Sequence, residues 1–240
     1  MTKLLYHSDS YLKKFSANVV EVKQEISAVI LDQTAFYPGG GGQVFDVGKI
    51  EFNGTSSTIA RAKNNANGVL HIIKEDDSIP DVGCEVNGIL DWERRYKVMR
   101  THTAMHILCG TIFRDYSALV TGGDMEPLKG RMDFEFEHLT KDLVGVIEKA
   151  VNKEVALNHT VRTAIHSRED AFKIPDLIRT KINLLPEHIQ EIRTVEIIGL
   201  DLQADGGTHV HQTSEVGTIH ITDYKSKGKI NKRLYLELEP

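Results

Sequence analysis

The hydrophobic period of this sequence changes near Asp91, and this change constrains the fold more than any other feature. Before it, short runs rich in β-branched residues, such as 19–23, alternate with turns rich in glycine and asparagine. This pattern is typical of the strands of a small barrel or sandwich. Over residues 92–113, apolar and histidine side chains recur at helical intervals. We therefore predict two domains, residues 1–91 and residues 92–240.

The predicted elements place the chain in the α+β class. We expect strands in the first domain at 19–23, 27–31, 49–52, 69–73 and 83–90. In the second domain we expect strands at 131–137, 161–165, 194–198, 216–222 and 233–238. Thr140 is expected to cap a helix that runs to about Asn158, and a helix over 168–178 is interrupted by Pro175. The prediction is a small N-terminal β-barrel-like domain followed by an α+β domain with helices packed on a mainly antiparallel sheet.

Composition excludes several classes of protein. The two cysteines, Cys84 and Cys109, are too few for a disulfide framework and fit a reducing cytosol. The N-terminus turns polar before the apolar core of a signal peptide can form, and no apolar run approaches the roughly 20 residues of a membrane span. A formal net charge of −5 argues against a general polyanion binder. We therefore predict a cytoplasmic protein without membrane contact, whose oligomeric state the sequence leaves open.

Two pairs of side chains suggest a metal site. His102 and His106 are four residues apart, so on a helix they lie on one face and can offer two nitrogens to one ion. Asp205 and His209 flank a Gly-Gly turn, which can present two more ligands. Three histidines and one aspartate suit zinc or another borderline divalent metal. The alternative is a core histidine, a solvated histidine and an ordinary turn before a strand.

Two other interpretations of the helix are weaker. Cys109 continues the same face, but seven residues rise roughly 10 Å, so His102 and Cys109 would struggle to share one ion. Cys109 is better explained as a small core residue. A zincin protease needs the motif His-Glu-x-x-His, whereas Thr103 follows His102 here, so the required general base is absent.

Three segments together carry a family resemblance. They are Asp-x-Thr-x-Phe-Tyr-Pro-Gly-Gly-Gly-Gly-Gln at 32–43, Arg-Thr-His-Thr-Ala-x-His at 100–106 and Gln-x-Asp-Gly-Gly-Thr-His-Val at 203–210. A proline followed by four glycines forms a loop whose backbone can take positive φ and approach another chain closely. The set resembles the editing domain of alanyl-tRNA synthetase, and most of all its free-standing relatives, the AlaX trans-editing proteins. The glycine-rich N-terminal part indicates their medium-length type.

The resemblance implies a zinc-dependent hydrolase that deacylates alanine tRNA mischarged with serine or glycine. His102, His106 and His209 match three of the family's four metal positions, and Asp205 stands where the family usually has cysteine. Asp205 would bind the metal directly or hydrogen-bond to a metal-bound water. The implied catalytic residues are Thr34, Gln43, His102, His106 and His209. The implied substrate-binding residues are Thr34, Gly40, Gly41, Gly42, Gln43 and Gln203.

Selection of serine over alanine needs a polar contact, because an apolar pocket discriminates poorly against an added hydroxyl. In the family this role falls to the threonine of Asp-x-Thr, here Thr34. The ester itself is labile, so positioning and modest activation suffice. A zinc ion can activate water, polarise the carbonyl or anchor the substrate amine. The sequence leaves these three roles open.

Two basic groups are candidates for tRNA contact, and solvated surface is the alternative for both. One holds Arg94 and Arg95, and the other holds Lys225, Lys227 and Lys229. Asp133 is a candidate for orienting a ligand histidine. Two rival functions stay open, namely a tRNA-binding accessory module with a structural metal and a metal-dependent hydrolase of another aminoacyl ester.

Overall fold

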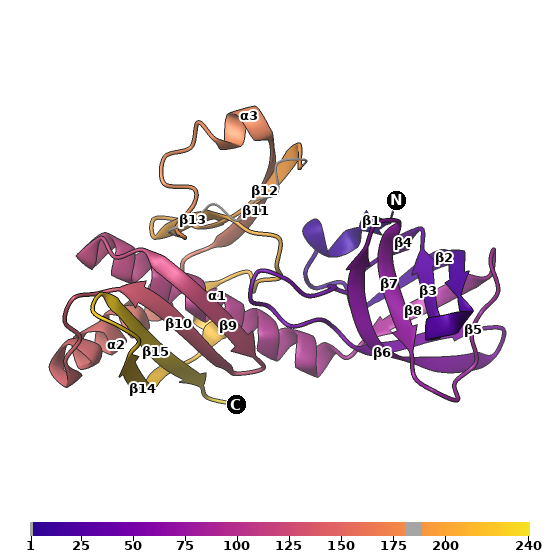
Figure 1. Ribbon diagram of the computed structural model, residues 1–240, viewed down its shortest axis with the longest axis horizontal. Coiled ribbons are helices and arrows are strands. Elements are labelled where there is room, and N and C mark those ends of the chain that lie inside the picture. Colours follow the sequence, from indigo (N-terminus) through magenta and orange to yellow (C-terminus); the bar gives the residue numbers. More distant parts are fainter. Residues whose placement is uncertain (1, 181–188) are drawn as a thin grey trace. The chain divides into compact units, whose positions relative to one another are not determined.

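The computed structural model describes residues 2–180 and 189–240 (Figure 1). The chain divides into two compact units, Met1–Tyr96 (unit 1) and Lys97–Pro240 (unit 2). The division falls inside helix α1 (Trp92–Tyr116). Unit 1 is built on a closed barrel and unit 2 combines helices with antiparallel sheets, which confirms the predicted fold class.

Unit 1 is a barrel of six antiparallel strands that close in the order β2-β3-β7-β6-β5-β8 (Figure 1). Their bounds are β2 Lys14–Lys23, β3 Ala28–Leu31, β5 Gly48–Phe52, β6 Thr55–Asn65, β7 Gly68–Ile73 and β8 Glu85–Leu90. Along β2 the side chains of Phe15, Ala17 and Val19 alternate inward, as the period of a strand requires. Phe36, Ile50 and related side chains fill the interior, so the barrel is a packed core.

Short elements complete unit 1. β1 (Lys3–Leu4) pairs in parallel with β4 (Gln33–Thr34), which follows β3 closely in the chain. The 3-10 helices η1 (Leu5–His7) and η2 (Gln24–Ile26) connect the strands. β6 was not anticipated from the sequence, because most of its side chains are exposed and polar.

Unit 2 contains a four-stranded antiparallel sheet with the strand order β14-β15-β10-β9. The strands are β9 Val120–Glu126, β10 Lys129–Glu135, β14 Ile219–Ser226 and β15 Asn231–Leu238. Helix α1 packs directly on this sheet. A Cβ atom added to Gly130 of β10 would lie 3.0 Å from the sulfur of Met105, so glycine there gives the helix room.

Helix α2 (Lys141–Ala156) begins as predicted. The Thr140 side chain accepts a hydrogen bond from the backbone N–H of Leu143 at 3.2 Å, which caps the helix. Ile147 and Val151 lie on its buried side. Among the described residues, no helix is both long enough and apolar enough to cross a membrane.

A second sheet of three antiparallel strands carries β11 (Val161–Ser167), β12 (Glu191–Ile197) and β13 (Asp201–Ala204). Two predicted boundaries are corrected nearby. The helix α3 covers only Arg168–Ala171, well short of the predicted end at 178. Pro175 lies within the predicted range, and because proline lacks a backbone N–H it does not fit a helix interior. The predicted strand at 216 begins at Ile219, because Thr213–Val216 forms the 3-10 helix η3.

Candidate metal centre

Within unit 2 the structure brings together the four side chains that the sequence analysis selected as candidate metal ligands. His102 and His106 extend from α1, and Asp205 and His209 come from the loop after β13. One donor atom from each residue lies within 4.8 Å of those of the other three. The Nε2 atom of His102 is 3.5 Å from Asp205 Oδ1, and that of His209 is 3.0 Å from Asp205 Oδ2. All three histidines are buried.

Two neighbouring groups set the orientation of the rings. His106 Nδ1 lies 3.1 Å from a carboxylate oxygen of Asp201, which can only accept, so Nδ1 carries the proton. His209 Nδ1 lies 3.1 Å from the hydroxyl of Thr103 on α1. Both rings therefore turn Nε2 toward the cluster, the arrangement that metal-binding histidines usually require.

Asp201 belongs to the candidate site through its contact with His106, and the sequence analysis did not select it. The candidate proposed from the sequence was Asp133, but its carboxylate accepts hydrogen bonds from Arg233 at 2.6 and 2.8 Å. Asp201 reaches the site because α1 has a glycine one turn after His106. A Cβ atom added to Gly110 would lie 2.8 Å from the Cβ of Asp201. Gly110 is the signal in the sequence that could have pointed to Asp201. A glycine inside a helix shows that something packs closely there, but only the structure shows that this is Asp201 of β13.

The loop that carries Asp205 is held by hydrogen bonds. The backbone N–H of Gly207 donates to Asp205 Oδ2 at 2.8 Å, which closes a tight turn. Arg193 of β12 donates to the carbonyl oxygens of Asp205 and Gly207 at 3.0 and 2.9 Å. Its guanidinium is buried, so it fixes the loop from inside the protein. Arg193 also escaped the sequence analysis.

Gln203 lies beside this network. Its amide N–H donates to Asp201 Oδ2 at 2.6 Å and sits 3.5 Å from His106 Nδ1. The structure thus places Gln203 as a partner of the carboxylate that orients His106, and its contact with a substrate stays a prediction. Cys109 is a buried core residue, as predicted, and burial raises the pKa of its thiol well above the ordinary value.

Burial and neighbouring charges shift the pKa values of the four groups. Burial, with the charge of His209 adding to it, holds the pKa of His102 well below its ordinary range, and burial lowers the pKa of His209 to about 4. Burial also acts to lower the pKa of His106, but the hydrogen bond and charge of Asp201 outweigh it and raise that pKa. Burial disfavours ionised Asp205, yet the nearby His102 and His209 hold its pKa well below the usual value.

This donor set fits a divalent metal ion. Neutral imidazole and ionised carboxylate are the forms that bind metals, and the pKa shifts of His102, His209 and Asp205 favour them. The raised pKa of His106 acts in the opposite direction, so a metal ion there would have to displace a proton more readily bound than on the other two rings. In a tetrahedral zinc site with bonds of about 2.0–2.2 Å, the donor atoms lie roughly 3.3 Å apart. The distances of 3.0 and 3.5 Å from Asp205 to His209 and His102 are close to that spacing. The cluster could therefore hold a metal ion after small adjustments.

We expect the substitution Asp201→Asn to weaken metal binding by roughly 10- to 100-fold, because partners that orient a ligand histidine contribute this much to metal affinity. The variant keeps the shape of the side chain but loses the charge opposite His106 Nδ1. Equilibrium dialysis against zinc measures the effect. Asp133→Asn is the matched control, since Asp133 lies in the same unit and pairs with Arg233 instead. Equal losses in both variants would contradict the assignment.

Thr34 and Gln43 flank the glycine loop of unit 1. Gly40 and Gln43 exchange backbone hydrogen bonds of 3.0 and 2.9 Å across a tight turn. Gly41 and Gly42 at the centre of this turn have φ values of 58° and 86°, which glycine adopts without strain. The side chains of Thr34 and Gln43 are buried. The Thr34 hydroxyl lies 2.7 Å from Nε2 of His71, another residue that the sequence analysis did not select.

The structure corrects one candidate for tRNA contact. Arg95 is fully buried in unit 1, where its guanidinium pairs with Asp46 and donates to the carbonyl oxygens of Ser10 and Ala35. A guanidinium enclosed in this way cannot reach a phosphate. Its neighbour Arg94 is half-buried and donates to the carbonyl oxygen of Phe45 at 2.6 Å.

The lysine group is accessible. Lys225, Lys227 and Lys229 are exposed, at the end of β14 and in the turn that leads to β15. Lys225 also forms an ion pair of 3.3 Å with Asp223. These side chains can meet an anionic partner, and their contact with tRNA stays a prediction.

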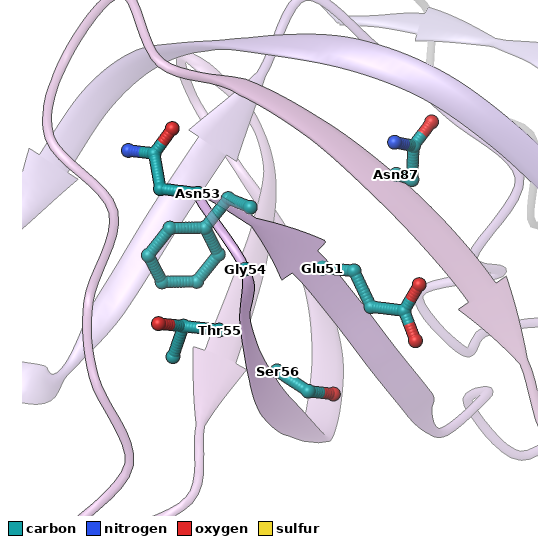
Figure 2. A pocket seen from close by; sticks show the side chains of 7 residues that line it. Glu51, Asn53, Gly54, Thr55, Ser56 and Asn87 are labelled. Atoms are coloured by element: carbon teal, nitrogen blue, oxygen red, sulfur yellow. The ribbon is translucent and has the colours of Figure 1, made fainter.

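Figure 2 shows a pocket in unit 1 around the turn between β5 and β6, with a volume of about 340 Å³. Glu51, Asn53, Thr55 and Ser56 line it from this hairpin, and Asn87 lines it from β8. None of the residues selected from the sequence lines this pocket. It is open to solvent and gives no support to a catalytic role.

Two family models match parts of the chain. Residues 7–94 match the family model described as tRNA synthetases class II (A). Residues 192–235 match the model described as threonyl and alanyl tRNA synthetase second additional domain. The second match includes Asp205 and His209.

Whole-chain relatives are also found. The chain is 39% identical over 242 residues to the alanyl-tRNA editing protein AlaX-M of Saccharolobus solfataricus, covering 100% of both chains. It is 37% identical over 244 residues to the AlaX-M of Methanosarcina acetivorans, covering 99% of both. It is 35% identical over 226 residues to the alanine–tRNA ligase of Ignicoccus hospitalis, covering 92% of this chain but only 24% of that ligase.

Proposed function

Because the chain belongs to the AlaX-M family of alanyl-tRNA editing proteins, we propose that it is a trans-editing deacylase for alanine tRNA that carries the wrong amino acid. The substrates that we propose are alanine tRNA charged with serine or with glycine. The observation that carries the proposal is the convergence of His102, His106, Asp205 and His209 in a chain that matches editing proteins over its whole length. We place its action in the cytoplasm, where charged tRNA is used.

We propose zinc as the metal, because three imidazole nitrogens and one carboxylate suit this ion. Bound there, zinc would supply a Lewis acid or lower the pKa of a water molecule to about 7. His102, His106 and His209 would hold it through Nε2, with Asp205 as a direct ligand or as a hydrogen-bond partner of a bound water. Asp201 and Thr103 would keep two of the rings in place.

The reaction that these groups would support is ester hydrolysis. Water adds to the carbonyl carbon of the aminoacyl ester, the bond to the ribose oxygen breaks, and that oxygen takes up a proton. The products are a free amino acid and uncharged tRNA, and no nucleotide is consumed. Since the ester is labile, the protein contributes mostly by positioning the ester for attack and by rejecting tRNA that carries the correct amino acid.

For recognition of the serine side chain we propose Thr34, with Gln43 and the glycine loop as further substrate-binding residues of unit 1. Both side chains are buried, so substrate contact requires movement of the loop that contains the exposed Gly40 and Gly41. For the tRNA phosphates we propose Arg94 and the exposed lysines Lys225, Lys227 and Lys229. Their contribution would fall as the salt concentration rises.

Deacylation of alanine tRNA charged with serine, glycine or alanine tests the proposal. We expect release of serine and glycine, little release of alanine, and loss of activity after treatment with a chelator. Thr34→Val keeps the shape of the side chain but removes the hydroxyl, so its preference for serine over alanine should fall. Tight zinc binding without release of any amino acid would instead favour an accessory tRNA-binding module. Release of amino acids from free esters alone would favour a hydrolase of another aminoacyl ester.

A further inference from the structure

His71 is a buried titratable group in unit 1 that the proposed chemistry does not use. It lies on β7, and its side chain has no exposed surface. Burial lowers its pKa to about 4, so the ring is neutral near pH 7. Burying an imidazole is costly unless both nitrogens find partners. The hydrogen-bond partners of His71 therefore indicate which ring nitrogen carries the proton and which residue the ring positions.

The two ring nitrogens have different partners. Nδ1 lies 3.3 Å from the carbonyl oxygen of Val29 on the neighbouring strand β3. A carbonyl oxygen only accepts, so Nδ1 of the neutral ring carries the proton and Nε2 carries a lone pair. Nε2 lies 2.7 Å from the hydroxyl oxygen of Thr34. It follows that the Thr34 hydroxyl donates its hydrogen to His71. The ring of Phe36 packs edge-on against His71 and helps to hold it.

This hydrogen bond fixes the role of the Thr34 hydroxyl. A threonine hydroxyl has one hydrogen and two lone pairs. The hydrogen is directed to His71, and one lone pair accepts the backbone N–H of Phe36 at 3.1 Å. What is left is one lone pair, which can only accept. A serine hydroxyl can donate to it, whereas the methyl group of alanine would leave it unpaired, which disfavours alanine.

We propose that His71 is a specificity-determining positioning residue, which holds the Thr34 hydroxyl as a hydrogen-bond acceptor for the side chain of the mischarged serine. The inference rests on the proposed function, because it assumes that Thr34 contacts serine. Without an acceptor at the Nε2 position, the Thr34 hydroxyl would rotate and could donate elsewhere. His71 itself need not touch the substrate.

A matched pair of variants separates positioning from packing. The amide of Asn reaches only the position of Nδ1, so His71→Asn retains a donor for Val29 and loses the acceptor for Thr34. The longer side chain of Gln can place its amide oxygen at the position of Nε2, so His71→Gln restores the acceptor. His71→Leu is a third variant without polar atoms, in case the polar variants fold poorly. Thermal unfolding of each full-length protein reports whether it is folded.

The measurement is kcat/KM for seryl- and alanyl-tRNA, with the metal content verified. We expect His71→Asn and His71→Leu to lower the ratio of serine to alanine activity by roughly 3- to 10-fold, the value of one hydrogen bond. His71→Gln should recover most of it. Combined with Thr34→Val, His71→Asn should cause no further loss of this ratio, because both changes remove the same contact. Nitrogen NMR of the wild-type ring should show the proton on Nδ1.

The outcomes distinguish this inference from the proposed function. If Thr34→Val loses serine preference while the Asn and Leu variants keep it, the inference is overturned and the proposed function stands. Independent, multiplicative losses in the double variant, or a ring with its proton on Nε2, would also overturn it. If Thr34→Val leaves serine preference intact, the role of Thr34 fails and the inference fails with it. Chelator-sensitive release of serine would still support the deacylase.

Discussion

His102→Ala is expected to lower deacylation of seryl-tRNA by at least about 100-fold, since even partners behind a ligand contribute 10- to 100-fold to metal affinity or activity. The substitution removes one of three imidazoles from the cluster and leaves Asp205 without the neighbour that lies 3.5 Å from its Oδ1. The remaining two histidines and the carboxylate would hold a metal ion less tightly.

Two measurements on the same preparation decide this prediction. The first is zinc content per chain after dialysis, which should fall well below that of the unmodified protein. The second is the rate of serine release from seryl-tRNA. His220→Ala is the matched control, because His220 is exposed, lies on β14 and pairs with Glu239. A His102→Ala protein that keeps both its zinc and its rate would remove His102 from the proposed ligands, and one that loses its zinc but keeps its rate would remove the metal from the proposed mechanism.

Arg95→Met is expected to lower the free energy of unfolding of unit 1 by about 3–5 kcal/mol, the usual cost of breaking a buried ion pair from one side. Arg95 and Asp46 are both buried. Loss of the guanidinium leaves the Asp46 carboxylate with only the N–H of Tyr37 as a partner among these contacts. It also leaves the carbonyl oxygens of Ser10 and Ala35 without their donors from Arg95.

The ion pair between Arg95 and Asp46 also helps to hold the glycine loop in place. Arg95 bonds to Ala35 and Asp46 bonds to Tyr37, so the ion pair ties together the start and the end of the segment that holds the glycine loop. A destabilised Arg95→Met protein should therefore lose serine preference at temperatures where unit 2 still retains the metal ion proposed for it.

Urea unfolding followed by tryptophan fluorescence measures this effect, because Trp92 is the single tryptophan and belongs to unit 1. Arg94→Met is the matched control. Arg94 is half-buried and forms a hydrogen bond with Phe45, so its loss should cost only about 1 kcal/mol. If the two variants unfold at the same urea concentration, the buried ion pair does not stabilise unit 1 as described.

The sequence permitted correct predictions wherever the cause is local. Helical spacing alone places His102 and His106 on one face of α1, and both extend from it into the cluster. Thr140 caps α2 because its own side chain reaches the next turn. The glycines at 41 and 42 form a tight turn because their backbone tolerates positive φ. The resemblance in three motifs likewise identified the family.

Prediction failed wherever the partner lies far along the chain. Arg94 and Arg95 are neighbours in the sequence, yet only Arg95 is enclosed, because Asp46 is buried beside it. Asp201 was overlooked in favour of Asp133, since its approach to His106 depends on Gly110 leaving space between a helix and a strand. Composition and periodicity contain no information about such pairings.

The sequence by itself therefore determined the donor groups, through residue type and short-range spacing along one helix and one turn. The tertiary structure alone decided how those groups are used. It turns the Nε2 atoms of His106 and His209 inward through Asp201 and Thr103, and it directs the hydrogen of Thr34 toward His71. The reason is that a ring's orientation depends on which distant acceptor or donor the strand pairing brings within about 3 Å of it.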